Sequence, residues 1–370
     1  MSEVRFVVVA AGTGGHIYPG LSIAGSLQER VSEAKISFIG RPNSAEESAI
    51  TKQGYDFYPI RAKALPRRIS LQLLTSGAIL SYSTLRCIRL LRHLRPRMII
   101  SIGGFVSVPV VLAARMLKIP VAMHEPNALP GLANKFMAKY ARVVMLGFAG
   151  AAKYMPPQAN MVVTGTPIRP EIMATTKEAG RQGLGIDRSK KMLLVVGGSQ
   201  GAKSINESME EAANAFKDRQ DLVILHQTGP GHFAEVCKRF GGTSDRAIDG
   251  NRTIVPYIQQ MPLALAAADL IVCRAGAVTL AEITAAGLPA VVIPYPFAAE
   301  DHQRKNALEL VEAGAAIMID DGELTGEALA NAVLTILDDD VRSHRMAHAS
   351  KNLGKPAALQ EITKTILNLM

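Results

Sequence analysis

Short apolar runs, each followed by a helical pattern, alternate along the first half of the chain. Most of the runs are continuous and only a few residues long, as is typical of parallel strands buried on both faces of a sheet. Helical patterns lie between them, for example at 20–31, 106–117 and 131–139. This alternation predicts a doubly wound α/β sheet. Its predicted strands are residues 4–10, 35–39, 56–60, 97–102, 120–123, 142–146 and 160–163.

The same alternation starts again after a polar connection at 164–190 that Gly and Pro punctuate. An apolar run at 193–196 leads into it, and a chain of 370 residues is too long for one ordinary core. We therefore predict two Rossmann-like domains, 1–166 and 167–349, and a C-terminal helix at about 350–370 able to pack back on the first domain. The further strands of the second domain are predicted near 222–226, 252–255, 269–273, 290–293 and 315–319.

Residues 61–97 interrupt the alternation. They contain nine Lys or Arg and no Asp or Glu, so their charge equals the net charge of +9 of the whole chain. An apolar stretch lies between the two basic ends, as in elements that bind an anionic membrane surface. A buried crossover helix with solvated arginines is the alternative. Nucleic-acid binding is not expected, because Tyr82 is the only aromatic side chain available for stacking.

The cysteines and the N-terminus bear on where the chain works. Cys87, Cys237 and Cys273 are widely spaced and odd in number, which argues against a disulfide framework or a zinc cluster. We find no signal peptide and no uncharged apolar stretch of membrane-spanning length. We therefore expect a peripheral protein at the cytoplasmic face of the cell membrane.

Three glycine-rich turns follow predicted strands, at 12–15, 103–104 and 197–201. Ligands of open α/β sheets bind beyond the carboxyl ends of the strands, and a helix N-terminus there favours an anion. One such turn equally fits an ordinary strand-to-helix connection. Three turns in two domains predict a site for two phosphorylated groups.

A sharper signal lies at 274–282, after another apolar run. Gly276 allows the turn, and the amides of 277–279 are placed to hold a diphosphate. Glu282 is placed to accept hydrogen bonds from a ribose diol, although a carboxylate there also complements the helix dipole. Gln303 opens a later helix and is placed to bind a sugar hydroxyl, with a solvated helix start as the alternative.

These motifs, in this order and spacing, resemble the MurG family of glycosyltransferases over essentially the whole chain. Members of that family transfer N-acetylglucosamine (GlcNAc) from UDP-GlcNAc to the 4-hydroxyl of the N-acetylmuramic acid of lipid I. The product, lipid II, serves peptidoglycan synthesis and hence cell shape and division. The resemblance implies a GT-B fold, two Rossmann-like domains facing across a cleft, and an inverting transfer. The motifs that carry it are Gly12-Thr13-Gly14-Gly15-His16, Gly103-Gly104-Phe105-Val106-Ser107, His124-Glu125-Pro126-Asn127, Gly197-Gly198-Ser199-Gln200-Gly201-Ala202 and Arg274-Ala275-Gly276-Ala277 through Glu282.

The resemblance also implies a donor site for UDP-GlcNAc, mainly in the second domain. Ser199 would contact the diphosphate, the backbone of Ile258 the uracil, and Gln303 the sugar. The phosphates and the ribose would be held by Ala277, Val278, Thr279, Leu280, Ala281 and Glu282. The first domain and the linker would complete the donor site with Thr13, Gly14, Gly15, Asn127 and Arg169.

The acceptor, a lipid-linked diphosphate, is matched to the N-terminal glycine turns. The implied acceptor residues are Gly14, Gly15, Gly103, Gly104 and His124. The acceptor hydroxyl must lose a proton, and an imidazole titrates in the right range, so His16 is the leading candidate for the general base. A turn histidine that binds a phosphate or caps the helix is the alternative. Glu125 is a second catalytic candidate, or it orients a neighbour.

Helix N-terminal amides and Arg169 are sufficient to stabilise the leaving diphosphate. We find no Asp-x-Asp arrangement placed to chelate a diphosphate-bound cation, so neither a metal nor a cofactor is expected. Three other functions remain open from the sequence. They are a UDP-GlcNAc epimerase, another GT-B transferase acting on a glycolipid or small natural product, and a non-catalytic nucleotide-sugar or membrane-binding protein.

Overall fold

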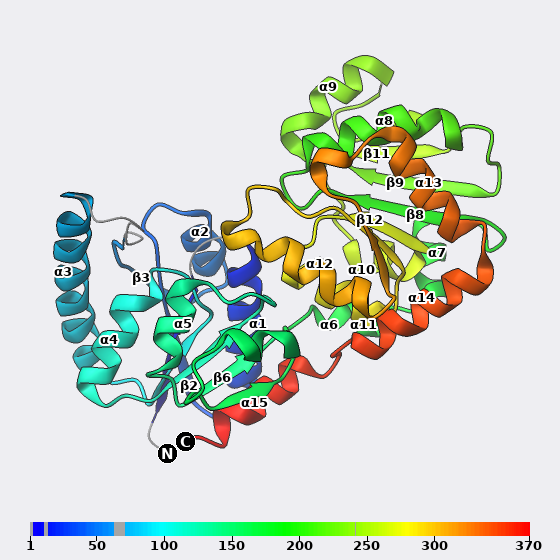
Figure 1. The fold of residues 1–370 in the computed structure, drawn as a ribbon. Coiled ribbons are helices and arrows are strands. Elements are labelled where there is room, and N and C mark those ends of the chain that lie inside the picture. The colour runs from blue at the N-terminus through cyan, green and yellow to red at the C-terminus, as the bar shows by residue number, and fades with distance from the viewer. Residues whose placement is uncertain (1–2, 11–13, 63–70, 241) are drawn as a thin grey trace. The chain divides into compact units, whose positions relative to one another are not determined.

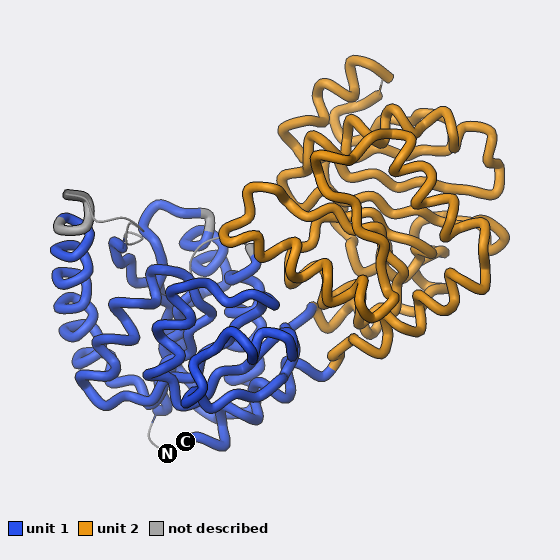
Figure 2. Tube along the Cα trace, in the orientation of Figure 1, with its two compact units in different colours: residues 1–168, 357–370 blue, residues 169–356 orange. Residues whose placement is uncertain are grey.

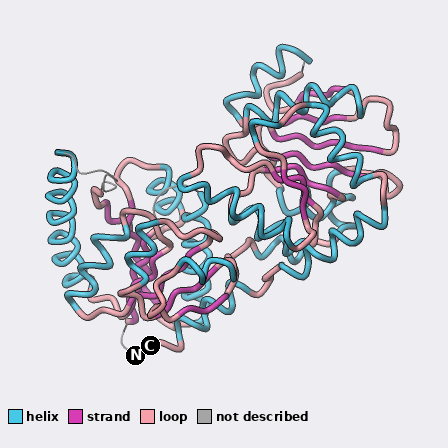
Figure 3. Tube along the Cα trace, in the orientation of Figure 1, coloured by secondary structure: helices cyan, strands magenta, loops and turns pink. Residues whose placement is uncertain are grey.

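The computed structural model describes residues 3–10, 14–62, 71–240 and 242–370. The chain divides into two units, shown in Figure 2. Unit 1 comprises residues 1–168 and 357–370, and unit 2 comprises residues 169–356. Each unit is a sheet with helices on both faces (Figure 3), as the alternating pattern predicts.

Unit 1 contains a seven-stranded parallel sheet with the order β3-β2-β1-β4-β5-β6-β7. Figure 1 shows the sheets and helices of the chain as a ribbon. Every strand predicted for the first half of the sequence is present. The strands are β1 (Val4–Val9), β2 (Ala34–Gly40), β3 (Asp56–Pro59), β4 (Met98–Ser101), β5 (Val121–Glu125), β6 (Val143–Leu146) and β7 (Met161–Val163).

Both faces of this sheet are buried under helices. Successive side chains of a strand point to opposite faces, so a continuous apolar run contributes to the core on each side. Val7 and Val9 pack under α3 (Leu71–Leu94), α4 (Ser107–Leu117) and α5 (Leu132–Ala138). Phe6 and Val8 pack on the other face, under α1 (Gly14–Arg30), α2 (Ala45–Lys52) and α15 (Ala358–Leu367). A short 3-10 helix, η1 (Ala149–Tyr154), follows β6.

The C-terminal helix α15 returns to unit 1 and packs beside α1. It buries Ile362 and Ile366, and the Thr363 hydroxyl donates to the Ser26 hydroxyl at 3.0 Å. The chain therefore begins and ends in the same unit.

Unit 2 contains a second seven-stranded sheet with the order β10-β11-β9-β8-β12-β13-β14. All its pairs are parallel except β10 with β11, which form a hairpin. The sequence pattern misses β10, because this strand is only three residues long and has no continuous apolar run. The strands are β8 (Lys191–Val196), β9 (Leu222–Gln227), β10 (Ala247–Asp249), β11 (Arg252–Val255), β12 (Leu270–Cys273), β13 (Ala290–Val292) and β14 (Ala316–Met318).

The helices of unit 2 cover both faces of its sheet. On one face α8 and α13 enclose a core that contains Leu193, Val195 and Phe216. The helices are α6 (Pro170–Ala174), α7 (Lys177–Leu184), α8 (Lys203–Phe216), α9 (Pro230–Phe240), α10 (Met261–Ala267), α11 (Ala277–Ala286), α12 (His302–Glu312), α13 (Gly326–Leu337) and α14 (Asp340–Leu353), with short 3-10 helices η2 (Ala299–Asp301) and η3 (Asp321–Glu323).

The structure sharpens the bounds of two segments that the sequence pattern describes. The helix predicted at 20–31 begins at Gly14, so Gly15 and His16 belong to its first turn, whereas Thr13 lies outside the described residues. In the basic segment 61–97, residues 63–70 also lie outside them, and α3 forms most of the rest. None of the described helices is both long enough and apolar enough to cross a membrane.

Candidate functional site

The predicted site residues of unit 1 gather at one edge of its sheet. The start of α1 follows β1, Gly103 and Gly104 follow β4, and Glu125 ends β5. These three strands are neighbours in the order β1-β4-β5, so their carboxyl ends lie together. Gly103 and Gly104 have φ values of +102° and +83°, which favour glycine.

Glu125 is the central group of this edge. Its Oε1 accepts from the backbone N–H of Asn127 at 2.9 Å and from the Asn127 side chain at 3.2 Å. Its Oε2 accepts from Nδ2 of Asn134 at 2.6 Å. Burial raises the pKa of Glu125 to about 7, although these donors favour the ionised form. The carboxyl is therefore poised to gain or lose a proton near neutral pH.

Asn134, on α5, was not identified from the sequence. A Cβ atom on Gly103 would lie 2.7 Å from its Nδ2, so the glycine makes room for this side chain. The same short segment contains Lys135, so the sequence does not distinguish Asn134 from a solvated polar residue. Asn134 joins the Gly103 turn to the end of β5 through Glu125.

His124 is fully buried and points to the opposite face from Glu125, because adjacent residues of a strand alternate. Its Nε2–H donates to the carbonyl of Gly165 at 3.1 Å. Burial lowers the pKa of His124 to about 4, and the nearby charge of His16 acts in the same direction. His124 is thus neutral at pH 7 and lies close enough to His16 for their charges to interact. Its predicted contact with the acceptor remains a prediction.

In unit 2, two helix N-termini lie at the carboxyl edge of the sheet. Helices α8 and α11 follow β8 and β12, which are neighbouring strands. Neither N-cap residue, Ala202 or Gly276, gives a side-chain hydrogen bond to the first turn. The first-turn amides of such helices suit an anion. Side chains do cap three other helices of this unit, from Thr176, Thr325 and Asp339.

The predicted donor residues are placed around these helix ends. Ser199 is exposed in the turn before α8. The residues Ala277, Val278, Thr279, Leu280, Ala281 and Glu282 form the first turns of α11. Ile258 follows β11, and its backbone N–H donates to Oε1 of Gln227 at 2.8 Å. Gln303 lies in the first turn of α12 and accepts from the backbone N–H of Tyr295 at 2.9 Å.

Two residues assigned to different parts of the donor bind each other. The guanidinium of Arg169 holds both carboxylate oxygens of Glu282, at 2.8 and 3.0 Å. Burial raises the pKa of Glu282, and Arg169 opposes that shift. Arg169 immediately precedes α6, so this bidentate pair fixes the start of α6 against α11.

Arg274 has a structural role that the sequence did not indicate. Its guanidinium donates to the carbonyls of Ile293 and Pro294 at 3.3 and 3.1 Å and to the hydroxyl of Ser204 at 2.9 Å. It also pairs with Asp321, which accepts from Ser204 at 2.7 Å. Arg274 therefore joins the start of α8 to the loops after β13 and β14.

Comparison with known proteins agrees with this architecture. Residues 6–146 match the glycosyltransferase family 28 N-terminal domain, and residues 192–362 match the family 28 C-terminal domain. The two α/β units are the two halves of a GT-B fold, and the protein is a glycosyltransferase.

Individual relatives narrow the family further. Proteins from Halothermothrix orenii and Desulforudis audaxviator are each 40% identical, over 99% of this chain and 98% of their own length. Both are named UDP-N-acetylglucosamine–N-acetylmuramyl-(pentapeptide) pyrophosphoryl-undecaprenol N-acetylglucosamine transferase. A crystal structure of Acinetobacter baumannii MurG matches with a TM-score of 0.79 and 29% identity, covering 99% of this chain and all of that one. The chain belongs to the MurG branch of glycosyltransferase family 28.

The fold is also shared with other enzymes. The Staphylococcus aureus MnaA–UDP structure matches with a TM-score of 0.67 at 15% identity, over 99% of this chain and 98% of that one. At that identity the match establishes the fold alone.

Proposed function

We propose that this protein transfers GlcNAc from UDP-GlcNAc to the 4-hydroxyl of the N-acetylmuramic acid of lipid I, giving lipid II for peptidoglycan synthesis. The observation that carries the proposal is the 40% identity, along nearly the whole chain, to transferases named for this reaction. The two carboxyl edges, one in each unit, would supply the chemistry that the reaction needs.

Unit 2 is the proposed donor site. The diphosphate of UDP would bind the first-turn amides of α8 and α11, near Ser199 and Thr279. Ile258 would meet the uracil, Glu282 the ribose and Gln303 the sugar. Arg169 would add positive charge as the bond between the sugar and UDP breaks, and UDP leaves with the electron pair.

Unit 1 is the proposed acceptor site and holds the proposed base. His16 would take the proton of the acceptor hydroxyl as its oxygen bonds to the anomeric carbon, on the face opposite UDP. The neutral state of His124 avoids a second positive charge beside the imidazolium that forms. Glu125 would orient Asn127 and the Gly103 turn toward the substrates, since it binds Asn127 directly and also binds Asn134, which packs against Gly103.

Helix α3 is the proposed membrane contact. Its outer face carries apolar Tyr82 and Leu85, which are 60% and 58% exposed, followed one turn later by exposed arginines. The opposite face packs into the core through Cys87 and Leu91. An apolar stripe that ends in cationic side chains suits the surface of an anionic bilayer. The arginines on the outer face of α3 are Arg86, Arg89 and Arg92.

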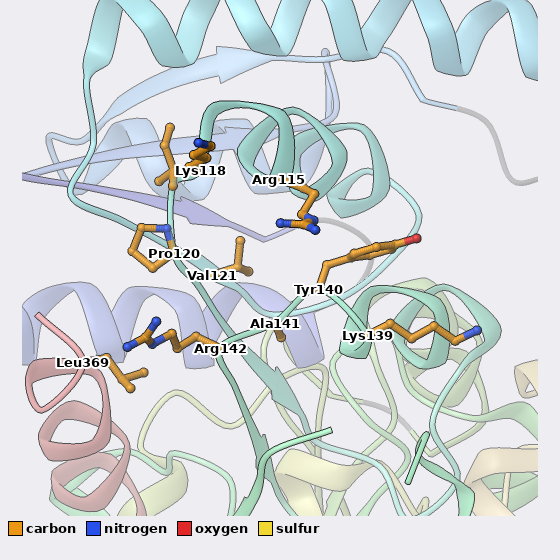
Figure 4. A pocket seen from close by; sticks show the side chains of 10 residues that line it. Arg115, Lys118, Pro120, Val121, Lys139, Tyr140, Ala141, Arg142 and Leu369 are labelled. Atoms are coloured by element: carbon orange, nitrogen blue, oxygen red, sulfur yellow. The ribbon is translucent and has the colours of Figure 1, made fainter. Parts of the chain in front are cut away.

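A basic groove at the amino edge of the unit 1 sheet supports the proposal that this side of unit 1 contacts the membrane. Its volume is about 670 Å³, and it lies between the end of α4 and the starts of β5 and β6 (Figure 4). Helices α3 and α4 pack together and both end at this edge, so their cationic ends extend one surface. Four cationic side chains and no acidic one line the groove, namely Arg115, Lys118, Lys139 and Arg142.

The activity is tested by incubating the protein with UDP-GlcNAc and a lipid I analogue. We expect UDP release that requires the acceptor, together with a product that carries the added sugar. Interconversion of the UDP-sugar without acceptor would instead indicate an epimerase. UDP binding with neither reaction would indicate a non-catalytic nucleotide-sugar binder.

The membrane contact is tested by co-sedimentation with anionic vesicles. Changing Arg86, Arg89 and Arg92 to Glu should abolish most of the binding, and salt should weaken binding of the wild type. The matched control changes Arg345, Lys351 and Lys355 of unit 2 to Glu, which gives the same change in net charge. Equal binding by the α3 variant and the wild type would show that α3 is not the contact.

A further inference from the structure

Gln227 joins two segments of the proposed donor site. It is the last residue of β9 and is only 1% exposed. Its Oε1 accepts from the backbone N–H of Ile258 at 2.8 Å, and its Nε2 donates to the carbonyl of Gly198 at 2.9 Å. One side chain therefore holds the segment after β11 and the turn between β8 and α8 at the same time.

The turn between β8 and α8 is also fixed from a second direction. A Cβ atom on Gly201 would lie 1.7 Å from the carbonyl oxygen of Thr228, and one on Gly229 would lie 2.1 Å from that of Gln200. Backbone therefore packs directly on backbone between this turn and the residues after β9. The segment of Ile258 is held at its start, where the backbone N–H of Thr228 donates to the carbonyl of Val255 at 3.0 Å. Beyond that point, the Gln227 side chain joins Ile258 to the turn itself.

We propose that Gln227 is a positioning residue that sets the spacing between the uracil-binding segment at Ile258 and the diphosphate-binding turn at Gly198. This inference rests on the donor site proposed above. A glutamine fits because one end of its amide accepts from an N–H while the other end donates to a carbonyl. An ionised carboxylate has only acceptors and would oppose the carbonyl of Gly198, whereas a protonated carboxyl again offers one donor and one acceptor.

This chemistry gives a test that mere damage to the fold does not reproduce. UDP binding to the full chain is measured by calorimetry at about pH 6 and about pH 9 for the wild type, Gln227→Glu and Gln227→Ala. Burial raises the pKa of the introduced carboxyl, so it is ionised only at the higher pH. We expect Gln227→Glu to bind UDP roughly tenfold more weakly than the wild type at the higher pH and to recover at the lower pH.

The controls separate this inference from the proposed function. Gln227→Ala should bind weakly at both pH values, because it can bridge at neither. Gln220→Glu places the same charge on an exposed residue before the other end of β9 and should follow the wild type. Unchanged binding by Gln227→Glu, or weak binding that does not recover at low pH, overturns the positioning role. Failure of the wild type itself to bind UDP would overturn the donor site instead.

In turnover assays, loss of positioning should raise KM for UDP-GlcNAc and change kcat little. This split follows because the bridge acts on segments that hold the donor before and during the reaction alike. A fall in kcat without a change in KM would contradict the assignment.

Discussion

The carboxyl edges of the two sheets differ in how they hold ionisable groups. In unit 1, His124 and Glu125 are buried and form no ion pair with any described residue, and their pKa values move to about 4 and about 7. In unit 2, Glu282 is paired with Arg169 and Asp321 with Arg274, beside helix ends that have no side-chain cap. The first edge suits proton transfer, and the second suits a multiply charged anion.

The proposed function assigns a different task to each edge of the same kind of scaffold. Both sheets have seven strands, and in both the first strand of the unit, β1 or β8, is an interior strand. Their functional groups come from the segments after the strands, which vary without disturbing the core. The chemistry of each unit is therefore set by a few side chains at one edge. The following substitutions test that contrast.

The largest expected effect is on proton transfer in unit 1. His16→Ala should lower kcat by about 10²-fold or more while leaving UDP affinity unchanged, because a general base acts on the acceptor hydroxyl. Turnover and UDP titration measure the two quantities, and His344→Ala, an exposed histidine of α14, is the control. A change confined to donor affinity would make His16 a phosphate ligand and remove the contrast between the edges.

The next effect is on the stability of unit 2. Gly201→Ala should destabilise the fold by about 3 kcal/mol or more, because Gly201 has a φ of +78° and its Cβ would overlap the carbonyl of Thr228. Thermal unfolding measures this loss. Gly231→Ala places a methyl group in open space within α9 and should be tolerated. Equal melting of the two variants would show that the turn is not held by close backbone packing.

A pH-dependent effect should distinguish the buried carboxyl of unit 1. The pKa of Glu125 is about 7 in the folded chain against an ordinary value of 4.5, so between these values the folded chain holds a proton that the unfolded chain has lost. Its contribution to stability therefore falls as pH rises through this window. Glu125→Gln removes that fall. From about pH 5 to about pH 8, its free energy of unfolding should therefore rise by up to about 3 kcal/mol relative to that of the wild type.

Denaturant unfolding at the two pH values measures this difference. His124 also titrates differently in the folded and unfolded chain, with a pKa of about 4 in the folded chain and an ordinary value of 6.5. Its contribution to stability therefore rises with pH between these two values. Because His124 is common to both proteins, it cancels in the comparison. A stability difference that is independent of pH would contradict a raised pKa for Glu125.

The smallest effect concerns the ion pair of unit 2. Arg169→Lys keeps the charge but loses the two parallel hydrogen bonds to Glu282, so UDP affinity should fall roughly tenfold with little change in kcat. Titration with UDP measures it. Arg219→Lys alters a second bidentate pair, with Asp221 before β9, and should leave UDP affinity unchanged. If Arg169→Lys leaves the UDP affinity unchanged, the ion pair holds α6 in place and does not contribute to donor binding.

The sequence by itself determined the local structure of this protein. Apolar runs specified every strand except β10, and turn glycines such as Gly103 marked the carboxyl edges where the proposed sites lie. The position of Glu282 in the first turns of α11 was also predictable, since the spacing from Gly276 is read within one helix. Short-range steric and hydrogen-bonding preferences decide such features, so they can be read from neighbouring residues.

Only the tertiary structure decided which distant residues meet. The pairing of Arg169 with Glu282, of Glu125 with Asn134 and the bridge made by Gln227 join different strands and helices. The contacts of Arg274 likewise join the start of α8 to two distant loops. Burial and distance in three dimensions set these contacts and the resulting pKa values, and periodicity along a chain carries neither quantity.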